Sequence, residues 1–377
     1  MATSSVVPAG DQHARAFAAF LRQTWDPHAT VESVERGWDE AAEANPVQPG
    51  QRSPTYVFLK DEEVIGHLGT LPVVLRHAGT ERHAVWLKGL MVLPEFRNGP
   101  VGYGLVKAAD HPYAMAMVVE EPARRLFTAL GFEDLGSVPN YLFPLDPSRV
   151  LRQATLALDS TGMRSAATKA MLRLARQPVV ATPAGWAVQA YTRLRLAMSG
   201  RRPRRAPDRI FASPIDESAC DVLWERIAPH VEGPVRSGRY LATRYGREVG
   251  RYVTLPLGTE SRLLGLAVLR RPSAHNDPRL GSLKVATLAD VVAEPTDGPT
   301  IRALLRMVIA EAASLGSDAV VASASHRRLR TSLLACGFVP IGANMHFLVR
   351  VPSGDLPLPP LDDWWLTRGD SRADESF

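Results

Sequence analysis

The sequence predicts an α/β (α+β) protein with two mixed-sheet domains, and three observations support this prediction. Apolar runs of strand length alternate with segments of helical periodicity over residues 10–145. A similar order of elements returns over residues 215–350, and a strongly basic segment separates the two. We therefore place a first domain at 1–146, a basic helical connector at 147–209, a second domain at 210–352 and a C-terminal tail at 353–377.

Length and composition agree with this division. A chain of 377 residues is long enough for two or three domains, each with its own core. Hydrophobic residues make up 45% and charged residues 22%, which is typical of soluble globular proteins. Apolar stretches such as Leu263 to Leu269 are shorter than a membrane span, and Met1 to Gly10 lacks the features of a signal peptide. We therefore expect a cytoplasmic protein.

The number and surroundings of the cysteines exclude some kinds of site. Cys220 and Cys336 are the two cysteines of the chain, too few for a disulfide framework or a zinc site. Neither has a histidine or carboxylate in a recognisable pattern around it, which argues against a nucleophilic thiol. We expect no metal site.

The first domain begins with two helices. Asp11 can cap a helix that runs through Trp25, and Thr30 can cap a second that runs to about Ala44. Strands follow, because apolar and β-branched residues then dominate and short polar turns divide them. The predicted strands are residues 55–60, 64–76 and 83–93.

A Gly-Phe element recurs along the chain. Gly131-Phe132 lines up with Gly337-Phe338 at a constant offset of 206 residues, and the neighbouring residues follow the same alignment. The elements before it repeat as well, which indicates an internal duplication at the scale of a domain. In the second copy these elements are an amphipathic helix from Asp216 to His230, later strands at 252–255, 263–270, 283–292 and 319–322, and helices at 300–315 and 327–335.

One turn of the first domain has the character of a phosphate-binding loop. Residues 97–102, Arg-Asn-Gly-Pro-Val-Gly, follow the apolar run from Trp86 to Leu93 and precede a segment of helical character. Glycines let the backbone approach a ligand closely, and the N–H groups and dipole of the following helix attract an anion. Pro100 offers no N–H to a phosphate, but proline is favoured at the first position of a helix.

A second segment, from Ala123 to Phe132, completes the pattern. Together the two segments resemble the motifs of the GNAT acyltransferase superfamily. The first motif is Arg or Gln, two free residues, Gly, one free residue, then Gly or Ala; Arg97 and Gly102 match it, and Pro100 stands where the first glycine is expected. Ala123, Leu126, Phe127, Gly131 and Phe132 fit the second motif.

The resemblance implies that the first domain binds acetyl-CoA or another acyl-CoA as cosubstrate. Backbone N–H groups around residues 90–92 would face the thioester carbonyl, and the turn at 98–104 would hold the pyrophosphate. Phe127 stands where members commonly carry a tyrosine that serves as acid for the departing thiolate; the alternative for Phe127 is ordinary core packing. The implied cofactor-binding residues are Leu90, Met91, Val92, Arg97, Asn98, Gly99, Val101, Gly102, Tyr103, Gly104 and Phe127.

Transfer to an amine also needs a base. His67, His83 and Glu120 sit on or beside the strands expected to line the cleft, and they are the catalytic candidates. Glu120 replaces an asparagine that is common in the superfamily. A structural role for each histidine, or an ordered chain of waters in place of a single base, remains the alternative.

The second copy departs from the pattern at its equivalent turn. Residues 294–299, Glu-Pro-Thr-Asp-Gly-Pro, lack the arginine-to-glycine spacing and carry two acids. An anionic pyrophosphate should not bind there, so we expect a structural or acceptor-binding repeat.

The connector has an unusual charge. Residues 147–209 hold 13 Lys and Arg against Asp159 and Asp208, while the whole chain has a net charge of +5. Such a segment can lie on an anionic membrane surface, attract a phosphorylated acceptor or contact nucleic acid; its apolar stripes can equally pack on the two domains. Trp186 and Tyr191 are its only aromatic rings, which argues against a site that stacks single-stranded nucleic acid.

The tail carries adjacent tryptophans, Trp364 and Trp365, after a proline-rich link. It resembles tails of some tandem GNAT-like proteins linked to surface-polysaccharide production, which implies an amino sugar or its nucleotide or lipid conjugate as acceptor. The alternative is a tail that packs on its own second domain.

These features predict an acyl-CoA-dependent acyltransferase, and more narrowly an N-acetyltransferase, that acts on an amine of a small-molecule or sugar-type acceptor. A non-catalytic binding or scaffold protein that kept the fold is one alternative. Aminoacyl transfer from charged tRNA, as in the tandem GNAT-like ligases of peptidoglycan bridges, is another, and it would explain the basic connector.

Overall fold

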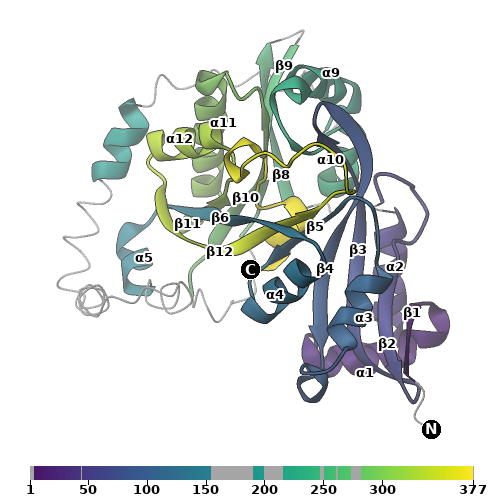
Figure 1. The fold of residues 1–377 in the computed structure, drawn as a ribbon. Helices are drawn as coiled ribbons and strands as arrows, with labels where there is room; N and C mark the ends of the chain where they lie inside the picture. Colours follow the sequence, from purple (N-terminus) through teal and green to yellow (C-terminus); the bar gives the residue numbers. More distant parts are fainter. Residues whose placement is uncertain are drawn as a thin grey trace. The chain divides into compact units, whose positions relative to one another are not determined.

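A computed structural model describes residues 4–43, 45–153, 190–198, 215–246, 250–259, 262–272 and 282–376. The chain divides into two compact units (Figure 1). Unit 1 comprises Met1–Ser137 and Met345–Leu358, and unit 2 comprises Val138–Asn344 and Pro359–Phe377. Most of the predicted connector lies outside the described residues, so its contacts with membranes, acceptors or nucleic acid stay predictions.

The sheet of unit 1 has the strand order β1-β2-β3-β4-β5-β12. Its strands β4 and β5 are parallel, and the other neighbouring pairs are antiparallel. The turn between β3 and β4 uses Ala78 and Gly79 at φ 50° and 75°, a left-handed conformation that glycine adopts without strain. The strands are β1 (Ser4–Pro8), β2 (Thr55–Lys60), β3 (Glu63–His77), β4 (Thr80–Val92), β5 (Ala114–Val118) and β12 (Val339–Arg350).

Helices cover both faces of this sheet. A Cβ on Gly66 of β3 would meet Val101 of helix α3, whereas His67 contacts Phe17 of helix α1. Because successive strand residues point to opposite faces, α1 and α3 lie on opposite faces of the sheet. The helices are α1 (Ala14–Thr24), which follows the 3₁₀ turn η1 (Asp11–His13), α2 (Val31–Glu43), α3 (Val101–Ala108), which follows η2 (Pro94–Phe96), and α4 (Glu121–Ala129).

Local sequence signals explain where the helices begin. Thr30 Oγ1 accepts the backbone N–H of Ser33 at 3.1 Å, so Thr30 caps α2 as predicted. Ser33 Oγ accepts the N–H of Thr30 at 2.9 Å and completes a reciprocal pair of hydrogen bonds. Pro100 is the residue that precedes α3, and its carbonyl accepts the N–H of Gly104 at 2.8 Å. Pro100 therefore initiates the helix, where a missing N–H leaves no helical bond unmade.

Unit 2 contains the strands β6-β11-β10-β9-β8, which are hydrogen-bonded in that order. Its parallel pair is β10·β11, which matches β4·β5 of unit 1. The strands are β6 (Glu133–Pro144), β11 (Ala319–Ser323), β10 (Val285–Ala293), β9 (Arg262–Arg270) and β8 (Tyr252–Thr259), with the short β7 (Gly233–Pro234). The helices are α5 (Pro147–Gln153), α9 (Glu217–Ile227), α10 (Gly238–Leu241), α11 (Gly298–Ser314) and α12 (Arg327–Ala335), with shorter turns at η3 (Ala228–His230), η4 (Ala242–Gly246), η5 (Leu361–Asp363) and η6 (Asp370–Ser376).

The two units do not coincide with the segments 1–146 and 210–352 that the sequence suggests. Residues 140–144 of β6 pair with β11 in unit 2, and residues 346–350 of β12 pair with β5 in unit 1. The two copies have therefore exchanged their last strands. Strand pairing is non-local, and β6 and β12 have similar sequences, so nothing in the residues themselves signals the exchange.

The internal duplication extends to backbone conformation. Gly131 and Gly337 have φ of 85° and 92°, and Gly136 and Gly342 both have φ of 107°. Glu120 precedes α4 as His326 precedes α12, again at the offset of 206 residues. The repeat is therefore one of folded elements as well as of sequence.

The tail packs within unit 2. Trp364 and Trp365 are 0% and 1% exposed, and Trp365 Nε1 donates to the carbonyl of Val291 on β10 at 2.8 Å. This is the alternative that the sequence left open for the adjacent tryptophans.

Among the described helices, none combines the length and the apolar character needed to cross a bilayer.

Candidate active site

The parallel strands β4 and β5 separate at one end. They pair from Val85↔Ala114 to Leu87↔Ala116, and no further pair joins them in the described part of the chain, although β4 continues to Val92 and β5 to Val118. From Gly89 to Val92, the backbone groups of β4 that face away from β3 have no partner on β5 among the described residues. Such an edge offers N–H donors to a ligand.

A β-bulge lies at the point of separation. On β3, His67 and Gly69 are opposite Met91 and Lys88 of β4, so β4 carries one extra residue at Gly89 and Leu90. A bulge disrupts the ladder and turns backbone groups out of it. Gly89 has φ of 63°, which accounts for glycine at this position. The implied thioester-facing residues, Leu90 to Val92, thus belong to a distorted and half-paired strand.

Helix α3 presents free backbone donors a few residues further on. In the described residues, no acceptor takes the N–H groups of Val101, Gly102 and Tyr103, as expected for the first turn of a helix. Pro100 has no side chain that could cap them. With the helix dipole behind them, these three N–H groups form a site suited to a phosphate group.

Arg97 connects the strand to this turn. Its Nε donates to the carbonyl of Val92 at 3.1 Å, while the side chain stays exposed. Arg97 therefore fixes the end of β4 relative to the turn and adds positive charge beside it. Asn98 and Gly99 are exposed, so the turn is open to solvent.

Glycines let α3 pack closely. A Cβ on Gly102 would lie 3.0 Å from Leu126 of α4, and a Cβ on Gly104 would lie 3.3 Å from Val6 and from Phe58. Tyr103 is 47% exposed. The residues that the sequence assigned to the pyrophosphate turn thus form one continuous, partly exposed segment, with the small residues required by packing.

His67 lies beside the bulge. It is opposite Met91 in the sheet, and its ring packs on Phe17 and Phe20 with centroid distances of 5.0 and 6.1 Å. Nδ1 is buried with no hydrogen-bond partner in the described residues. Burial, assisted by the nearby charge of Lys88, lowers the pKa of His67 to about 4. The imidazole is therefore neutral near pH 7 and can accept a proton, but burial makes it a weaker base than an ordinary histidine.

The lowered pKa of His67 predicts a pH dependence of stability. An unfolded histidine takes up a proton below its ordinary pKa of 6.5, whereas folded His67 does so only near 4. Unit 1 should therefore lose about 2–3 kcal/mol as pH falls from 6.5 to 4. Hydrogen exchange in unit 1 at several pH values measures this loss, which should shrink in His67→Phe and persist in His83→Phe, where an exposed ring is changed.

The other two catalytic candidates lie elsewhere in unit 1. His83 is exposed on β4, seven residues before Leu90 and therefore about 23 Å along the strand from the bulge. Glu120 is the exposed residue between β5 and α4, at the end where β4 and β5 separate. The structure thus brings His67 and Glu120 to the same end of the sheet and leaves His83 at the other.

Phe127 is part of the core. It is 2% exposed and meets Phe132 edge to face, with ring centroids 5.0 Å apart. The surroundings of Phe127 are therefore those of a core residue, as the packing alternative states. A ring in this position has no hydroxyl to offer a leaving thiolate.

Sequence reasoning missed one hydrogen-bonded chain in unit 1. His346 Nε2 lies 3.1 Å from Ser137 Oγ, and its Nδ1 lies 3.0 Å from Asp134 Oδ2. Arg124 of α4 donates to Asp134 at 2.9 Å. Burial raises the pKa of Asp134, but Arg124, the N–H of Gly136 and His346 outweigh it, and the net pKa is lowered. No sequence signal could have joined these residues, because β12 returns from the second copy.

These hydrogen-bonded residues lie apart from the phosphate turn. Arg124 leaves α4 on the side of Asp134, whereas Leu126 leaves α4 toward Gly102 of α3. Helix α4 therefore lies between the two. We therefore interpret the hydrogen bonds among Arg124, Asp134, His346 and Ser137 as structural contacts that hold β6 and β12 together. We assign these residues no role in acyl transfer.

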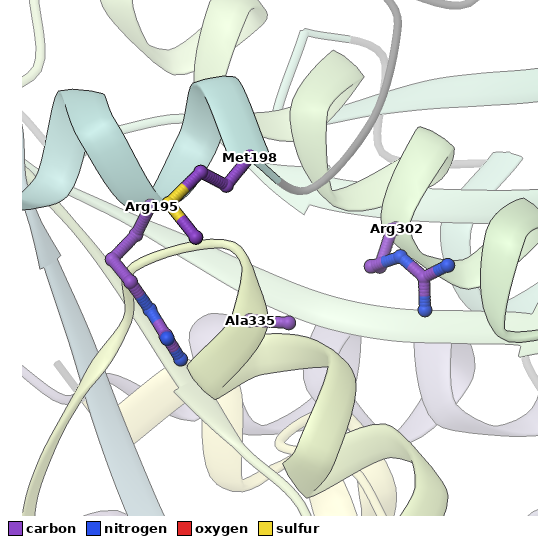
Figure 2. Close-up of a pocket in the computed structure, with 4 residues that line it drawn as sticks. All are labelled: Arg195, Met198, Arg302 and Ala335. Atoms are coloured by element: carbon purple, nitrogen blue, oxygen red, sulfur yellow. The ribbon is translucent and has the colours of Figure 1, made fainter.

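Unit 2 contains a separate cavity of about 270 Å³ (Figure 2). Arg195 and Met198 come from the helical residues 190–198, Arg302 from α11 and Ala335 from α12. Among the described residues, its lining supplies two guanidinium groups and neither a carboxylate nor an imidazole. None of the predicted site residues lies there.

Comparison with known proteins rests on structure alone. No protein-family model matches the sequence, and no curated protein matches it significantly. Solved structures do match over nearly the whole chain. A probable N-acyltransferase of unknown function from Enterococcus faecalis is 12% identical with a TM-score of 0.56, covering 93% of this chain and 73% of that one.

Two further structures agree. A GCN5-related N-acetyltransferase from Anabaena variabilis is 11% identical with a TM-score of 0.55, covering 93% of this chain and 73% of that one. N-myristoyltransferase from Saccharomyces cerevisiae, solved with bound myristoyl-CoA, is 10% identical with a TM-score of 0.56, covering 93% and 83%. The fold is therefore that of the GNAT-type N-acyltransferases, as the motifs around Arg97 and Gly131 predicted.

Proposed function

We propose that this protein is an acyl-CoA-dependent acyltransferase whose catalytic unit is unit 1. One observation carries the proposal. The end of β4 is bulged and paired on one side only, and the turn that follows it leads to the uncapped first turn of α3. The same strand-turn-helix segment therefore offers N–H donors for a carbonyl oxygen and, further along, N–H donors for a phosphate. An acyl thioester of coenzyme A presents those two acceptors in one molecule.

The turn from Asn98 to Gly104 would hold the pyrophosphate. The N–H groups of Val101, Gly102 and Tyr103 would donate to phosphate oxygens, and Arg97 would supply the nearest positive charge. Pro100 removes one further donor, a loss of roughly 1.5–3 kcal/mol where no other contact replaces it.

The β4 bulge would stabilise the transition state. When bound, acyl-CoA supplies an activated carbonyl carbon. N–H groups of Leu90 to Val92 that lack a strand partner would donate to the carbonyl oxygen as negative charge develops there. Such preorganised donors typically contribute a few kcal/mol each. Phe127 offers no proton to the leaving sulfur, but a thiol with a pKa of about 8.5 leaves readily as the thiolate.

His67 is the base that we propose for the acceptor amine. It lies beside the bulge with an unpartnered nitrogen, and it faces α1, whereas the phosphate turn belongs to the α3 face. The acceptor would then approach the acyl carbon from the α1 face, opposite the cofactor's phosphates. Glu120 is the second candidate, at the end of β5.

The acyl chain and the acceptor are finer proposals. The similar structures include both an N-acetyltransferase and an N-myristoyltransferase, so acetyl-CoA and longer acyl-CoAs are both candidates. For the acceptor we propose an amine of a small molecule, in particular an amino sugar or its conjugate, on the resemblance of the tail at Trp364 and Trp365. Peripheral contact of the basic connector with an anionic membrane would suit a lipid-linked acceptor.

The direct test is turnover. Purified protein is incubated with acetyl-, octanoyl- or myristoyl-CoA and with glucosamine or its nucleotide conjugate, while free thiol is measured with a colorimetric reagent and N-acylated product by mass spectrometry. Equal amounts of thiol and product are expected from at least one pair. His67→Ala should lower the rate by about 10²–10⁴, the usual contribution of a general base.

Other outcomes identify the alternatives. Acyl-CoA binding without thiol release for any acceptor would favour a non-catalytic binding protein. Copurified charged tRNA, together with a failure to bind any acyl-CoA, would favour aminoacyl transfer instead.

A further inference from the structure

Unit 2 repeats the strand separation described for unit 1. Strands β10 and β11 pair from Val285↔Ala319 to Leu288↔Ala322, and β10 then carries one extra residue at Ala289, opposite the junction of Leu269 and Val268 on β9. In unit 1 the bulge at Gly89 likewise follows the last pair of β4 with β5. The second copy has therefore kept the geometry of the proposed thioester site.

In unit 2 this place is filled by the chain itself. The N–H of Gly369 donates to the carbonyl of Ala289 at 2.7 Å, and Thr367 Oγ1 donates to Asp290 at 3.0 Å. On the other side, Thr367 forms an antiparallel bridge with Ala324, directly after β11, and Ser325 N donates to Leu366 at 3.2 Å. Residues 364–370 thus bond to the bulge of β10 and to the residues after β11 at the same time.

Exposure separates the two copies at equivalent positions. Gly89, Val119 and Glu120 are exposed in unit 1. Ala289, Ser325 and His326, their counterparts in unit 2, are 0%, 0% and 5% exposed. Trp364, Trp365, Leu366 and Thr367 cover them, and each of these is at most 2% exposed.

The phosphate position is also taken. Asp297 Oδ1 accepts the N–H of Thr300 at 3.0 Å, and Oδ2 accepts the hydroxyl of Thr300 at 2.6 Å, so a carboxylate caps the first turn of α11. The equivalent turn of α3 has no such cap. A second phosphate at α11 would have to displace a negative charge that already binds there.

We propose that residues 364–370 are an internal ligand, which occupies in unit 2 the groove that acyl-CoA occupies in unit 1, so that each chain has a single acyl-CoA site. The part about acyl-CoA rests on the proposed function; the part about the tail does not. The fit is close, because a Cβ on Gly369 would lie 2.1 Å from Tyr245 Oη and 2.8 Å from the carbonyl of Ala289. Glycine is therefore required where the tail crosses the bulge.

Hydrogen exchange of the full chain, with and without saturating acetyl-CoA or myristoyl-CoA, tests the proposal. In the wild type, acyl-CoA should slow exchange in residues 88–104 and leave residues 286–292, 323–326 and 364–370 unchanged. Calorimetry should give one acyl-CoA per chain. Faster exchange of 364–370 on binding, or two acyl-CoA per chain, would overturn the proposal, because the tail would then be displaced by cofactor.

A pair of variants tests the tail independently of acyl-CoA. Gly369→Ala should raise exchange of 364–370 and of 323–326 by about tenfold or more, because the added methyl overpacks the groove. Gly246→Ala, where a Cβ meets nothing within 4 Å, is the matched control and should exchange as the wild type does. Unchanged exchange in Gly369→Ala would overturn the proposed fit of the tail in the groove. If acyl-CoA does not change hydrogen exchange in unit 1 but Gly369→Ala still raises exchange of the tail tenfold, the result would contradict the proposed function. It would still support the tail as an internal ligand.

Discussion

Replacing Gly102 with glutamate is expected to abolish acyl-CoA binding. The new carboxylate would sit at the first turn of α3, where it can accept the free N–H groups itself and repel a phosphate, and its Cβ would start 3.0 Å from Leu126. In thermal unfolding, a ligand present at 100 times its Kd stabilises the wild type by about 2.7 kcal/mol. The variant should show no such shift.

Two controls separate charge from folding. Gly37→Glu adds the same charge to an exposed position of α2 where a Cβ meets nothing within 4 Å, and it should keep the full shift. Gly102→Gln keeps the size but not the charge, and it should bind with intermediate affinity. Survival of the full shift in Gly102→Glu would rule out α3 as the phosphate site.

Arg236→Met is expected to destabilise unit 2 by about 3–5 kcal/mol at pH 8, because removing one partner leaves buried charge uncompensated. Arg236 is 0% exposed; its Nε donates to Asp290 at 3.0 Å and its Nη2 to Asp370 at 2.7 Å. Urea unfolding, followed by tryptophan fluorescence, measures the change. Arg52→Ala is the control, since the pairs of Arg52 with Asp11 and Asp39 are exposed and worth about 1 kcal/mol or less.

The loss in Arg236→Met should depend on pH in a defined direction. Burial raises the pKa of Asp370 to about 6, and Arg236 holds it below what burial alone would give. Without Arg236 the folded state binds a proton more tightly, so acidification through pH 6 should stabilise folded unit 2 in the variant and narrow its difference from the wild type. An equal loss at pH 8 and pH 5 would contradict uncompensated charge as the cause.

Local features of the fold could be predicted from sequence. Thr30 and Asp216 each begin a helix as predicted, because capping depends on residues within one turn. Asp11 does not cap the first helix: Gly10 is the N-cap there, and the Asp11 carboxylate accepts from Arg52. The glycines at 131 and 337 mark the same left-handed position in both copies, and only a short segment is needed to recognise it. The turn at Arg97 to Gly102 was found for the same reason.

Features that depend on distant residues could not. The bulge at Gly89 exists only relative to the register of β3, and the depressed pKa of His67 depends on Phe17 and Phe20, which approach it from α1. The exchange of β6 and β12 could not be read from either strand. The position of the tail could not be predicted without knowing that β10 and β11 separate and leave a groove between them.

The exchange of β6 and β12 determines when the sheet of unit 1 can be completed during translation. Strand β12 borders β5 in unit 1, yet its paired residues, 346–350, follow almost the whole second copy in the sequence. Until they emerge from the ribosome, the edge of β5 stays open beside the proposed cofactor site, ready to pair with another chain. A fragment that stops at residue 146 would keep that open edge permanently. The residues that complete the sheet of the proposed catalytic unit are therefore made only after most of the second copy, and a fragment that ends at residue 146 lacks them.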